Sequence, residues 1–502
     1  MSTYLLGIDI GTSSCKVDLF RPDGENVASA SSNYEVICPA PGIAEQRPDD
    51  WWNGVCMAIR ELLESSGIAP EDIAAIGIDA QSWSAIPIAG DEVLYNTPIW
   101  TDMRAQKECD WAVERVGEDR LFECGGNPFK PSYTLPKILW YREHEPEVYA
   151  RAEKILQSNS YIAWRLTGEI AQDECLSYGY QCFDMAKGVW DEAIIAELGV
   201  RRSLLPEIVA CDTVIGKVSA RAAKQTGLCE GIPVVIGGLD AACGALGAGV
   251  YTDGQTQEQG GQAGGMSICM SEMKADKRLI LSRHVVRGKF LLQGGTVGGS
   301  GALKWLSEQL CLAEKLAGEK NGTDVFREMS AVADTIAPGS EGMIFLPYMS
   351  GERSPIWNPN AQGVYYGVDF SKTRAHMIRA CMEGVAFSLR HNCQVAAEAG
   401  APIERLFSMG GAANSLVWTQ IKSDVTGYPI DVPNTSSATT LGAAIVAGVG
   451  TGVYADYESA VKQTVQFKRH HEPNASLAGV YGRNYERYLE IYRSLEHMMN
   501  GA

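Results

Sequence analysis

The sequence has few of the patterns from which metal and disulfide sites are usually built. Its 502 residues include only seven histidines, none of them in an H-E-x-x-H segment. The fourteen cysteines are scattered singly, without a C-x-x-C pair. This pattern disfavours a structural zinc site and indicates buried thiols in a reducing compartment.

Positive charge is also in short supply. The chain has 43 Lys and Arg residues against 61 Asp and Glu, a formal net charge of −18. Because binding to a nucleic-acid backbone needs a basic face, we expect no nucleic-acid partner. An anionic nucleotide can still bind where backbone amides and a divalent cation supply positive charge locally.

Long apolar runs and an export signal are missing as well. The amino terminus enters a strand-like segment at Tyr4 without a basic stretch followed by a long apolar run. Even the apolar segment 438–449 is interrupted by glycine and falls short of the roughly 18 residues of a membrane helix. We therefore expect a cytoplasmic protein without a membrane partner.

The length predicts two domains with a cleft between them, because single cores stop growing near ~250–300 residues. We place the domains at 1–250 and 251–502, with a hinge near 249–253. From Gln257 a Gly-rich turn between two strands repeats the opening of the chain, which indicates an internal duplication.

Apolar spacing predicts an α/β alternation in both halves. In the first half, a hairpin at 4–20 and a strand at 27–31 precede a helix at 51–65, a buried strand at 73–78, helices at 135–141 and 160–165, and a strand at 233–238 leading into a helix at 241–249. In the second half we expect helices at 302–310, 374–392 and 440–448 and strands at 343–347 and 406–409.

Three segments could carry chemistry. The first, 7–14, is a strand ending in a turn of small hydroxyl residues, which could direct amides and hydroxyls at phosphate while Asp9 holds a metal. On this motif alone, an ordinary hairpin turn is the favoured interpretation. The second, 237–249, places Asp240 before a run of small residues, either exposed in a narrow cleft or as a plain N-cap. The third, 409–415, is a Gly-rich loop that could lie against an adenine or form a tight structural turn.

In order and spacing, these three segments resemble the phosphate, catalytic-aspartate and adenosine segments of the FGGY carbohydrate kinases. Segment 134–141 resembles the first family signature, with Tyr141 as a departure, and segments 363–368 and 376–384 resemble the second, with Cys381 as a mismatch. Segment 347–361 resembles the xylulokinase branch, and we interpret its Glu352-Arg353 pair as structural. The resemblance runs from Tyr4 to about residue 450.

The resemblance implies an α/β fold of two actin-like ATPase (ribonuclease H-like) domains, with the sugar in the first and ATP largely in the second. It implies ATP and Mg²⁺ as cofactors, a sugar or polyol as the other ligand, and a homodimer, the common state among relatives. Asp240 matches the catalytic base, and Asp9 and Asp240 match the metal site. Closure of the cleft would exclude water from the γ-phosphoryl group.

The family's remaining site positions also carry over. The nucleotide-facing positions are Gly11, Thr12, Ser13, Gly261, Gln262, Gly298, Gly299, Lys304, Gly410, Gly411 and Asn414. The substrate-facing positions are Gln81, Ser82, Trp83, Trp100 and Asp102, together with Asp240. Amides and carboxylates suit sugar hydroxyls and an indole suits the C–H face, although both tryptophans could equally fill the core.

Two departures from the family bear on function. Xylulokinases usually carry Met-His where this chain has Ser82-Trp83. The second phosphate hairpin of the family usually reads Gly-Thr-Ser, whereas the corresponding stretch here, 259–267, reads QGGQAGGMS. The first change leaves D-xylulose as the leading substrate, phosphorylated on a terminal hydroxyl, beside glycerol, erythritol, gluconate or another ketose. The second removes a hydroxyl donor, so weaker ATP binding and a non-catalytic sugar-binding relative stay open. A dinucleotide-dependent oxidoreductase is disfavoured, because no G-x-G-x-x-G follows the first strand.

Overall fold

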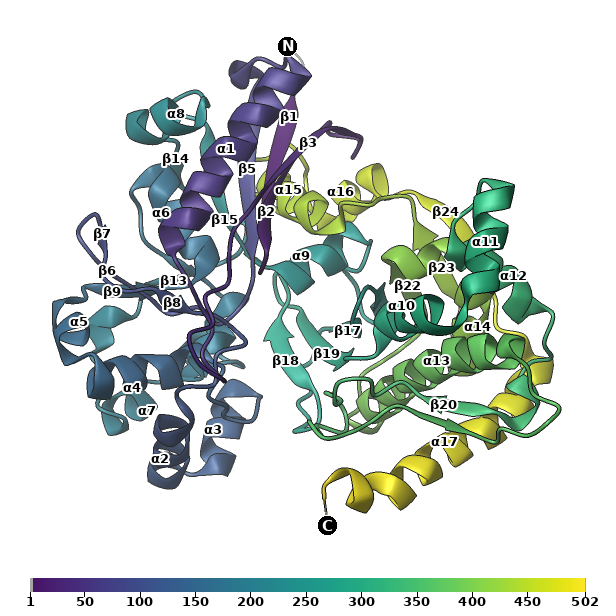
Figure 1. Ribbon diagram of the computed structural model, residues 1–502. Coiled ribbons are helices and arrows are strands. Elements are labelled where there is room, and N and C mark those ends of the chain that lie inside the picture. The colour runs from purple at the N-terminus through teal and green to yellow at the C-terminus, as the bar shows by residue number, and fades with distance from the viewer. Residues whose placement is uncertain (1–2, 502) are drawn as a thin grey trace.

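The computed structural model describes residues 3 to 501 and consists of two α/β halves side by side (Figure 1). The first half contains a six-stranded sheet, in the order β14 (Val214–Lys217), β15 (Pro233–Leu239), β5 (Ile73–Ala80), β1 (Tyr4–Ile10), β2 (Ser14–Phe20) and β3 (Asn26–Asn33). The second contains a seven-stranded sheet, in the order β18 (Ile280–Arg283), β19 (Phe290–Thr296), β17 (Gly264–Met270), β16 (Gln255–Gly260), β22 (Arg405–Met409), β23 (Ile430–Pro433) and β24 (Phe467–His471).

The two sheets share a six-strand topology, to which the second sheet adds β18 as an antiparallel edge strand beside β19. In each, a hairpin (β1–β2 or β16–β17) continues antiparallel on one side into β3 or β19. On the other side it continues parallel through two strands, β5 and β15 or β22 and β23, and ends in an antiparallel edge strand, β14 or β24. The internal duplication predicted from the turn after Gln257 is therefore confirmed at the level of strand order.

One face of the first sheet is covered by α1 (Pro48–Ser66) and α6 (Ser158–Thr167), and α8 (Ala220–Thr226) packs against both helices (Figure 1). Helix α1 buries Trp52, Val55, Ile59 and Leu62, the spacing that predicted it. Proline at its first position starts the helix, and a left-handed glycine, Gly67, ends it.

The other face of the first sheet is covered by α15 (Ala438–Gly450), which comes from the far end of the chain and packs on β1 and β5. Helix α15 also packs along α9 (Asp240–Gly247), so these two helices lie between the sheets (Figure 1). The approach is so close that a Cβ atom at Gly77 would lie 2.0 Å from the Ala443 carbonyl oxygen. The helix predicted at 440–448 is present, yet it covers the first sheet rather than its own half.

Helices and short strands inserted into the first half build a wall beside the sheet. They are α2 (Gln106–Val116), α3 (Glu118–Gly125), α4 (Thr134–His144), α5 (Pro146–Arg151), α7 (Glu192–Glu197), β4 (Glu45–Gln46), β6 (Ile86–Ala89), β7 (Glu92–Val93), β8 (Thr97–Pro98), β9 (Lys154–Leu156), β10 (Gln172–Asp173), β11 (Phe183–Asp184), β12 (Val189–Trp190) and β13 (Ile208–Val209).

The second half is completed by α10 (Gly299–Leu310), α11 (Leu312–Asn321), α12 (Val325–Asp334), α13 (Arg374–Glu398), α14 (Leu416–Thr426), α16 (Tyr457–Thr464), α17 (Ala478–Met499), β20 (Ile344–Leu346) and β21 (Val364–Tyr366). The strand predicted at 343–347 is present as β20, but it pairs with β21 in a separate ribbon. Within residues 3 to 501, no helix is both long enough and apolar enough to cross a membrane.

Candidate active site

Three aspartates lie at the carboxyl ends of three neighbouring parallel strands. Asp9 on β1 and Asp79 on β5 are register partners, and β5 pairs in turn with β15, which leads directly into Asp240. Because parallel strands end at the same edge of a sheet, this topology brings the three carboxyl groups together. Asp240 is the first residue of α9, and its carboxylate accepts a hydrogen bond from the adjacent Ala241 amide at 2.6 Å. It therefore makes no conventional N-cap bond to the second or third helical amide.

Burial raises the pKa values of all three carboxyl groups. The pKa of Asp240 rises to about 7, because burial and then the Asp9 charge disfavour its ionised form. The hydrogen bond from the Ala241 amide acts in the opposite direction and lowers this pKa. Burial raises the pKa of Asp9 to about 6, opposed by hydrogen bonding with Asp79 and by the Lys16 charge. The pKa of Asp79 lies well above its usual value, through burial and then the charge of Asp9. A carboxyl group that titrates near neutral pH is suited to accept a proton from an attacking hydroxyl.

This acidic cluster fits a divalent cation. Both carboxylate oxygens of Asp79 are buried, and among residues 3 to 501 their hydrogen-bond partner is the neighbouring Asp9 carboxyl group. The nearby Lys16 ammonium already contacts the Ser437 hydroxyl at 2.8 Å and the Asp18 carboxylate at 3.4 Å. Carboxylate oxygens are the ligands that Mg²⁺ prefers in proteins. The donor set of this edge therefore suits such an ion.

The turn between β1 and β2, the first phosphate hairpin (Gly11 to Ser13), is tied to the predicted substrate side. The indole N–H of Trp100 donates to the Thr12 hydroxyl at 2.9 Å, and the Gln46 amide donates to the Thr12 carbonyl at 2.8 Å. Gly11 and Thr12 are half-buried and Ser13 is exposed. Trp100 therefore links the predicted sugar and phosphate segments directly.

Gln81 and Trp83 follow β5 at the same edge. The Gln81 side-chain amide donates to Gln46 at 2.9 Å, which leaves its own buried oxygen without a donor among the described residues. Trp83 has a φ of 64°, rare for a bulky residue. Its indole stacks on Tyr133 with centroids 4.1 Å apart, and its N–H has no acceptor within residues 3 to 501. This half-buried indole therefore packs against Tyr133, and its N–H group has no acceptor among the described residues.

Asp102 is the predicted substrate residue whose bonding is most complete. Its carboxylate accepts from the Arg104 guanidinium at 2.8 Å and from the Ala44 amide at 2.7 Å, and the residue is fully buried. These contacts fix the loop that carries Trp100. Ser82, between Gln81 and Trp83, lies within hydrogen-bonding reach of Tyr178. Burial raises the pKa of Tyr178, and the hydrogen bond with Ser82 lowers it by a smaller amount.

Lys137, in the first family signature, is a functional candidate that the sequence did not single out. It lies on α4, fully buried, and donates to the Trp83 carbonyl at 2.8 Å and the Ile99 carbonyl at 2.7 Å. Burial lowers the pKa of this ammonium to about 7. One side chain thus positions both predicted substrate segments. A lysine within an apolar helical stretch was the signal that could have identified it.

The second half holds a pocket of about 770 Å³. Five predicted nucleotide positions line it: Gly261, Gln262, Lys304, Gly411 and Asn414. Gly410 immediately precedes the 3-10 turn Gly411–Asn414 and has a φ of 84°, which a non-glycine residue rarely adopts. The pocket brings together the start of α10, the β16–β17 turn and the loop after β22.

Gly298 and Gly299 stand apart from this lining. A Cβ atom at Gly298 would lie 1.7 Å from the Pro347 carbonyl oxygen, and one at Gly299 would lie 2.4 Å from the Gly264 amide nitrogen. The observed reason for glycine at both positions is therefore close backbone packing around the start of α10.

Arg469, Phe326 and Leu416 also line the pocket and were not predicted. Arg469 comes from β24, and its guanidinium donates to the carbonyl oxygens of Ala413 and Asn414. It therefore clamps the Gly411–Asn414 turn from a strand more than fifty residues away in sequence. Phe326 and Leu416 expose apolar surface, as a site for a flat ring requires.

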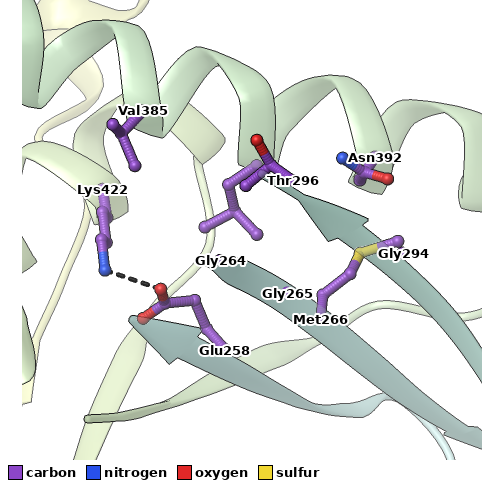
Figure 2. A pocket seen from close by; sticks show the side chains of 10 residues that line it. Glu258, Gly264, Gly265, Met266, Gly294, Thr296, Val385, Asn392 and Lys422 are labelled. Atoms are coloured by element: carbon purple, nitrogen blue, oxygen red, sulfur yellow. Dashed lines mark hydrogen bonds and ion pairs between the residues drawn. The ribbon is translucent and has the colours of Figure 1, made fainter. Parts of the chain in front are cut away.

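The turn between β16 and β17, the second phosphate hairpin (Gly260 to Gly264), is held from behind by a buried ion pair (Figure 2). Lys422 on α14 contacts Glu258 on β16 at 2.6 Å, and the Ser408 hydroxyl donates to the other Glu258 oxygen. A cavity of about 10 Å³ lies beside the pair. On the front, the Ser300 and Gly301 amides donate to the carbonyl oxygens of Gly261 and Gln262. The hairpin is therefore fixed from both sides without the Thr and Ser usual in the family.

Glu352 and Arg353, interpreted as structural, support the neighbouring β19 turn. Glu352 accepts from the Thr296 hydroxyl at 2.5 Å and the Val297 amide at 2.8 Å. Burial raises the pKa of the Glu352 carboxyl and lowers that of the Arg353 guanidinium. The hydrogen bonds from Thr296 and Val297 to Glu352 therefore join two chain segments of the second half.

Asp173, Cys175 and Cys211 form a buried group of potential metal ligands behind the β15 edge, with ligand atoms within 4.8 Å of one another. Asp173 accepts from the Asn159 amide and the Leu176 backbone, both at 2.7 Å. The Cys175 thiol donates to the Arg283 carbonyl at 2.9 Å. Protein groups therefore already satisfy this cluster.

The strand order and the placement of the site define a two-domain fold of the actin-like ATPase class. Residues 4–247 match the N-terminal domain, and residues 263–451 the C-terminal domain, of the FGGY family of carbohydrate kinases. The chain belongs to this family and is a carbohydrate kinase.

Similar proteins agree with this assignment over almost the whole length. The xylulose kinase of Escherichia coli is 30% identical, covering 98% of this chain and 99% of its own. The gluconokinase of Bacillus licheniformis is 26% identical, covering 99% and 97%. The crystal structure of xylulose kinase from Rhodospirillum rubrum matches with a TM-score of 0.89 at 29% identity, covering 99% of this chain and 100% of that one.

Proposed function

We propose that this kinase transfers the γ-phosphoryl group of ATP, with Mg²⁺, to a terminal hydroxyl of a small ketose, with D-xylulose as the leading substrate. The observation that carries the proposal is the placement of Asp9 and Asp240 at the ends of β1 and β15, the two parallel strands that flank β5, with phosphate hairpins and a nucleotide-sized pocket in the same chain. Xylulose kinases of similar length support the sugar.

Asp240 takes the proton of the attacking hydroxyl in this mechanism. Its pKa of about 7 keeps it partly ionised at neutral pH while making it a better proton acceptor than an ordinary aspartate. Burial and the Asp9 charge set that value. Asp9 and Asp240 are the residues that would hold Mg²⁺, and a bound Mg²⁺ would supply positive charge to the phosphate oxygens.

Positioning is the other part of the mechanism, because phosphoryl transfer depends mainly on alignment and charge stabilisation. The first hairpin is fixed to the substrate side through Trp100 and Thr12. The second is fixed by Glu258 and Lys422. In the second, the amides of Gly261 and Ala263 and the side chain of Gln262 replace the usual hydroxyls as donors to phosphate.

A sugar acid such as gluconate is the second candidate substrate. The Trp83 indole N–H is a buried donor without an acceptor in the described part of the chain, and a carboxylate would satisfy it as well as a hydroxyl would. The full-length similarity to a gluconokinase also favours this alternative. No contact in the site favours glycerol or erythritol in the same way.

The test is an ADP-release assay with Mg-ATP over a panel of ketoses, polyols and aldonates, run on the wild type, Asp240→Asn and Asp334→Asn. Asp334 is exposed on α12, so its variant controls for the loss of a charge. We expect turnover with one sugar, loss of roughly 10²–10⁴-fold in Asp240→Asn and no change in Asp334→Asn. Activity that survives in Asp240→Asn contradicts the mechanism. Absence of sugar-dependent ADP from folded wild type favours a non-catalytic sugar-binding relative.

A further inference from the structure

Arg353 is a largely buried cation whose side chain has no bonded partner in the described part of the chain. Its guanidinium Nε atom is enclosed and has no acceptor among residues 3 to 501. The neighbouring Glu352 carboxylate is already occupied. It accepts from the Thr296 hydroxyl at 2.5 Å and from the backbone amides of Val297 and Arg353. The charge of Glu352 therefore acts on Arg353 without an ion pair or a side-chain hydrogen bond between them.

Other buried cations of the second half are bonded. Arg379 contacts the Glu383 carboxylate at 2.9 Å, and Lys422 contacts the Glu258 carboxylate at 2.6 Å. Charged side chains are almost never buried without such a partner. Buried polar groups that lack a partner in the protein indicate a ligand, an ion or a water molecule. For a guanidinium, which only donates hydrogen bonds, that ligand is an anion.

The Arg353 guanidinium lies on one particular face of the second sheet. A Cβ atom at Gly295 on β19 would lie 2.9 Å from a guanidinium nitrogen of Arg353. A Cβ atom at Gly294 would instead lie 2.3 Å from the side chain of Asn392 on α13, the helix that covers this sheet in Figure 2. Because successive residues of a strand point to opposite faces, Arg353 lies on the face opposite α13.

That face is the one that meets α9. Gly295 is the register partner of Gly265 on β17, and Gly265 is the partner of Gln259 on β16. Paired residues share a face, and so does Gln257, two positions before Gln259. The side-chain nitrogen of Gln257 lies 3.4 Å from the place that a Cβ atom of Gly244 on α9 would occupy. The guanidinium is therefore on the side of the second sheet that is turned toward the first half.

The second phosphate hairpin ends beside this position. Gly265 directly follows the hairpin, and both Gly265 and its partner Gly295 are half-buried, while Gln259 is exposed. A Cβ atom added at Gly265 would have one neighbour within 4 Å, the Gly294 carbonyl oxygen at 3.3 Å. An anion held by the hairpin can thus approach this face without displacing a side chain.

We propose that Arg353 binds the terminal phosphate of the nucleotide, on the face of the second sheet turned toward the helix that begins with Asp240. The proposal rests on the proposed function for ATP as the donor. The planar guanidinium matches phosphate oxygens with two parallel donors and keeps its charge when buried. It supplies positive charge beside a hairpin that has no hydroxyl side chain between Gly260 and Gly264. Of the Glu352-Arg353 pair, Glu352 then keeps the structural role and Arg353 acts on the ligand.

The experiment is isothermal titration calorimetry of the full-length protein with Mg²⁺ and either ADP or the non-hydrolysable triphosphate AMP-PNP, without sugar. It compares the wild type with Arg353→Met, Arg353→Lys and Arg390→Met. Arg390 is the matched control, because it is a half-buried arginine of α13 that donates to the Val425 carbonyl at 3.1 Å and lies over the Tyr485 ring. Far-UV circular dichroism and Tm verify folding of each variant.

We expect Arg353→Met to weaken AMP-PNP binding roughly 10- to 100-fold, the usual effect of losing hydrogen bonds between charged groups. Binding of ADP should change much less, because ADP lacks the terminal phosphate. Arg353→Lys keeps the charge without the two parallel donors, so its affinity for AMP-PNP should lie between those of the wild type and Arg353→Met. Arg390→Met should bind both nucleotides as the wild type does.

Unchanged AMP-PNP binding in Arg353→Met overturns the proposal. Equal weakening of AMP-PNP and ADP binding also overturns it, since it would show that Arg353 supports the fold of the nucleotide side. If Arg353→Met does not fold, Arg353→Lys must weaken AMP-PNP binding more than ADP binding, and equal effects there count against the proposal. A wild type that binds neither nucleotide contradicts the proposed function itself, whereas the other two results leave that function standing and remove only the role of Arg353.

Discussion

At the scale of single residues, the ionisation of Asp240 links stability to activity. Asp9 shares its edge of the sheet, and the charge of Asp9 makes Asp240 harder to ionise. A base buried beside a like charge is strained in its working form, which active sites commonly tolerate.

The pH dependence of the reaction follows from this pair. Because Asp240 must be ionised to accept a proton, kcat/KM for the sugar should fall below an apparent pKa of about 7. Asp9→Asn removes the like charge, so the remaining activity should show that limb at lower pH. Steady-state rates from pH 5 to 9 measure the apparent pKa in the wild type and in Asp9→Asn. An apparent pKa that is the same in both proteins contradicts the effect of the Asp9 charge on Asp240.

The same pKa predicts that Asp240→Asn is the more stable protein at high pH. A carboxyl group whose folded pKa is raised above 3.8 gives full stability below pH 3.8 and loses it as pH rises through 7. Asparagine cannot ionise, so the variant should gain about 0.5–2 kcal/mol at pH 8 and nothing near pH 4. Apparent Tm at both pH values tests this, with Asp334→Asn as the control. A gain that does not depend on pH would contradict the assigned cause.

At the scale of elements, the nucleotide side is held together by contacts between segments far apart in sequence. The β16–β17 hairpin depends on α14 through Lys422, and the Gly411–Asn414 turn depends on β24 through Arg469. Each contact joins a flexible Gly-rich loop to a regular element, as a preorganised binding site requires.

Breaking the buried ion pair should destabilise the second half. Lys422→Met leaves the Glu258 charge buried without its partner, which costs about 3–5 kcal/mol, while the double variant with Glu258→Met should recover most of the loss. Urea unfolding monitored by tryptophan fluorescence compares the three proteins. A double variant as unstable as Lys422→Met would show that the loss comes from packing rather than charge.

Removing the Arg469 clamp should affect nucleotide binding selectively. Arg469→Met loses hydrogen bonds to two carbonyl groups of the Gly411–Asn414 turn, so KM for ATP should rise about 3- to 10-fold, the effect of about 0.5–1.5 kcal/mol. The KM for the sugar should stay the same. Lys468→Met is the control, because that lysine reaches only the Asn414 side chain at 3.4 Å. An equal rise in both KM values would point to general loosening instead.

At the scale of the whole molecule, the two halves are joined by α9 and α15, which lie between the sheets (Figure 1). Helix α15 belongs by sequence to the second half and covers the first sheet through glycine contacts at Gly7 and Gly77. The strands that carry Asp9 and Asp79 are thus in contact with the end of the second half. Any relative movement of the halves passes through this layer.

Gly77→Ala tests that contact. A Cβ atom there would meet the Ala443 carbonyl oxygen at 2.0 Å, so the helix must shift, at a cost of about 1–3 kcal/mol or more. Gly482→Ala in α17 is the control, because no atom lies within 4 Å of its added Cβ atom, and it should gain about 0.4–1 kcal/mol. Tm reports both changes. A Gly77→Ala protein with unchanged Tm would show that α15 is not packed as described.

The sequence by itself determined the features that depend on local order. Strands and helices with clear apolar periodicity, such as 4–20, 51–65 and 233–238, were predicted within a few residues. The order of the three motifs and two signatures indicated the family, which the domain matches confirm. The roles of the individual site residues, the domain boundary near Gly249, the homodimer and the choice of sugar stay predictions.

Only the tertiary structure decided which side chains share a site. Lys137 joins two substrate segments, Arg469 clamps a turn from another strand, and Asp79 stands between Asp9 and Asp240, and none of these pairings has a fixed spacing along the chain. Parallel strands are joined by long crossovers, so residues seventy or more positions apart meet at one sheet edge. Helix α15 likewise packs on the first sheet rather than on the second, where it buries the apolar face that contains Gly7 and Gly77.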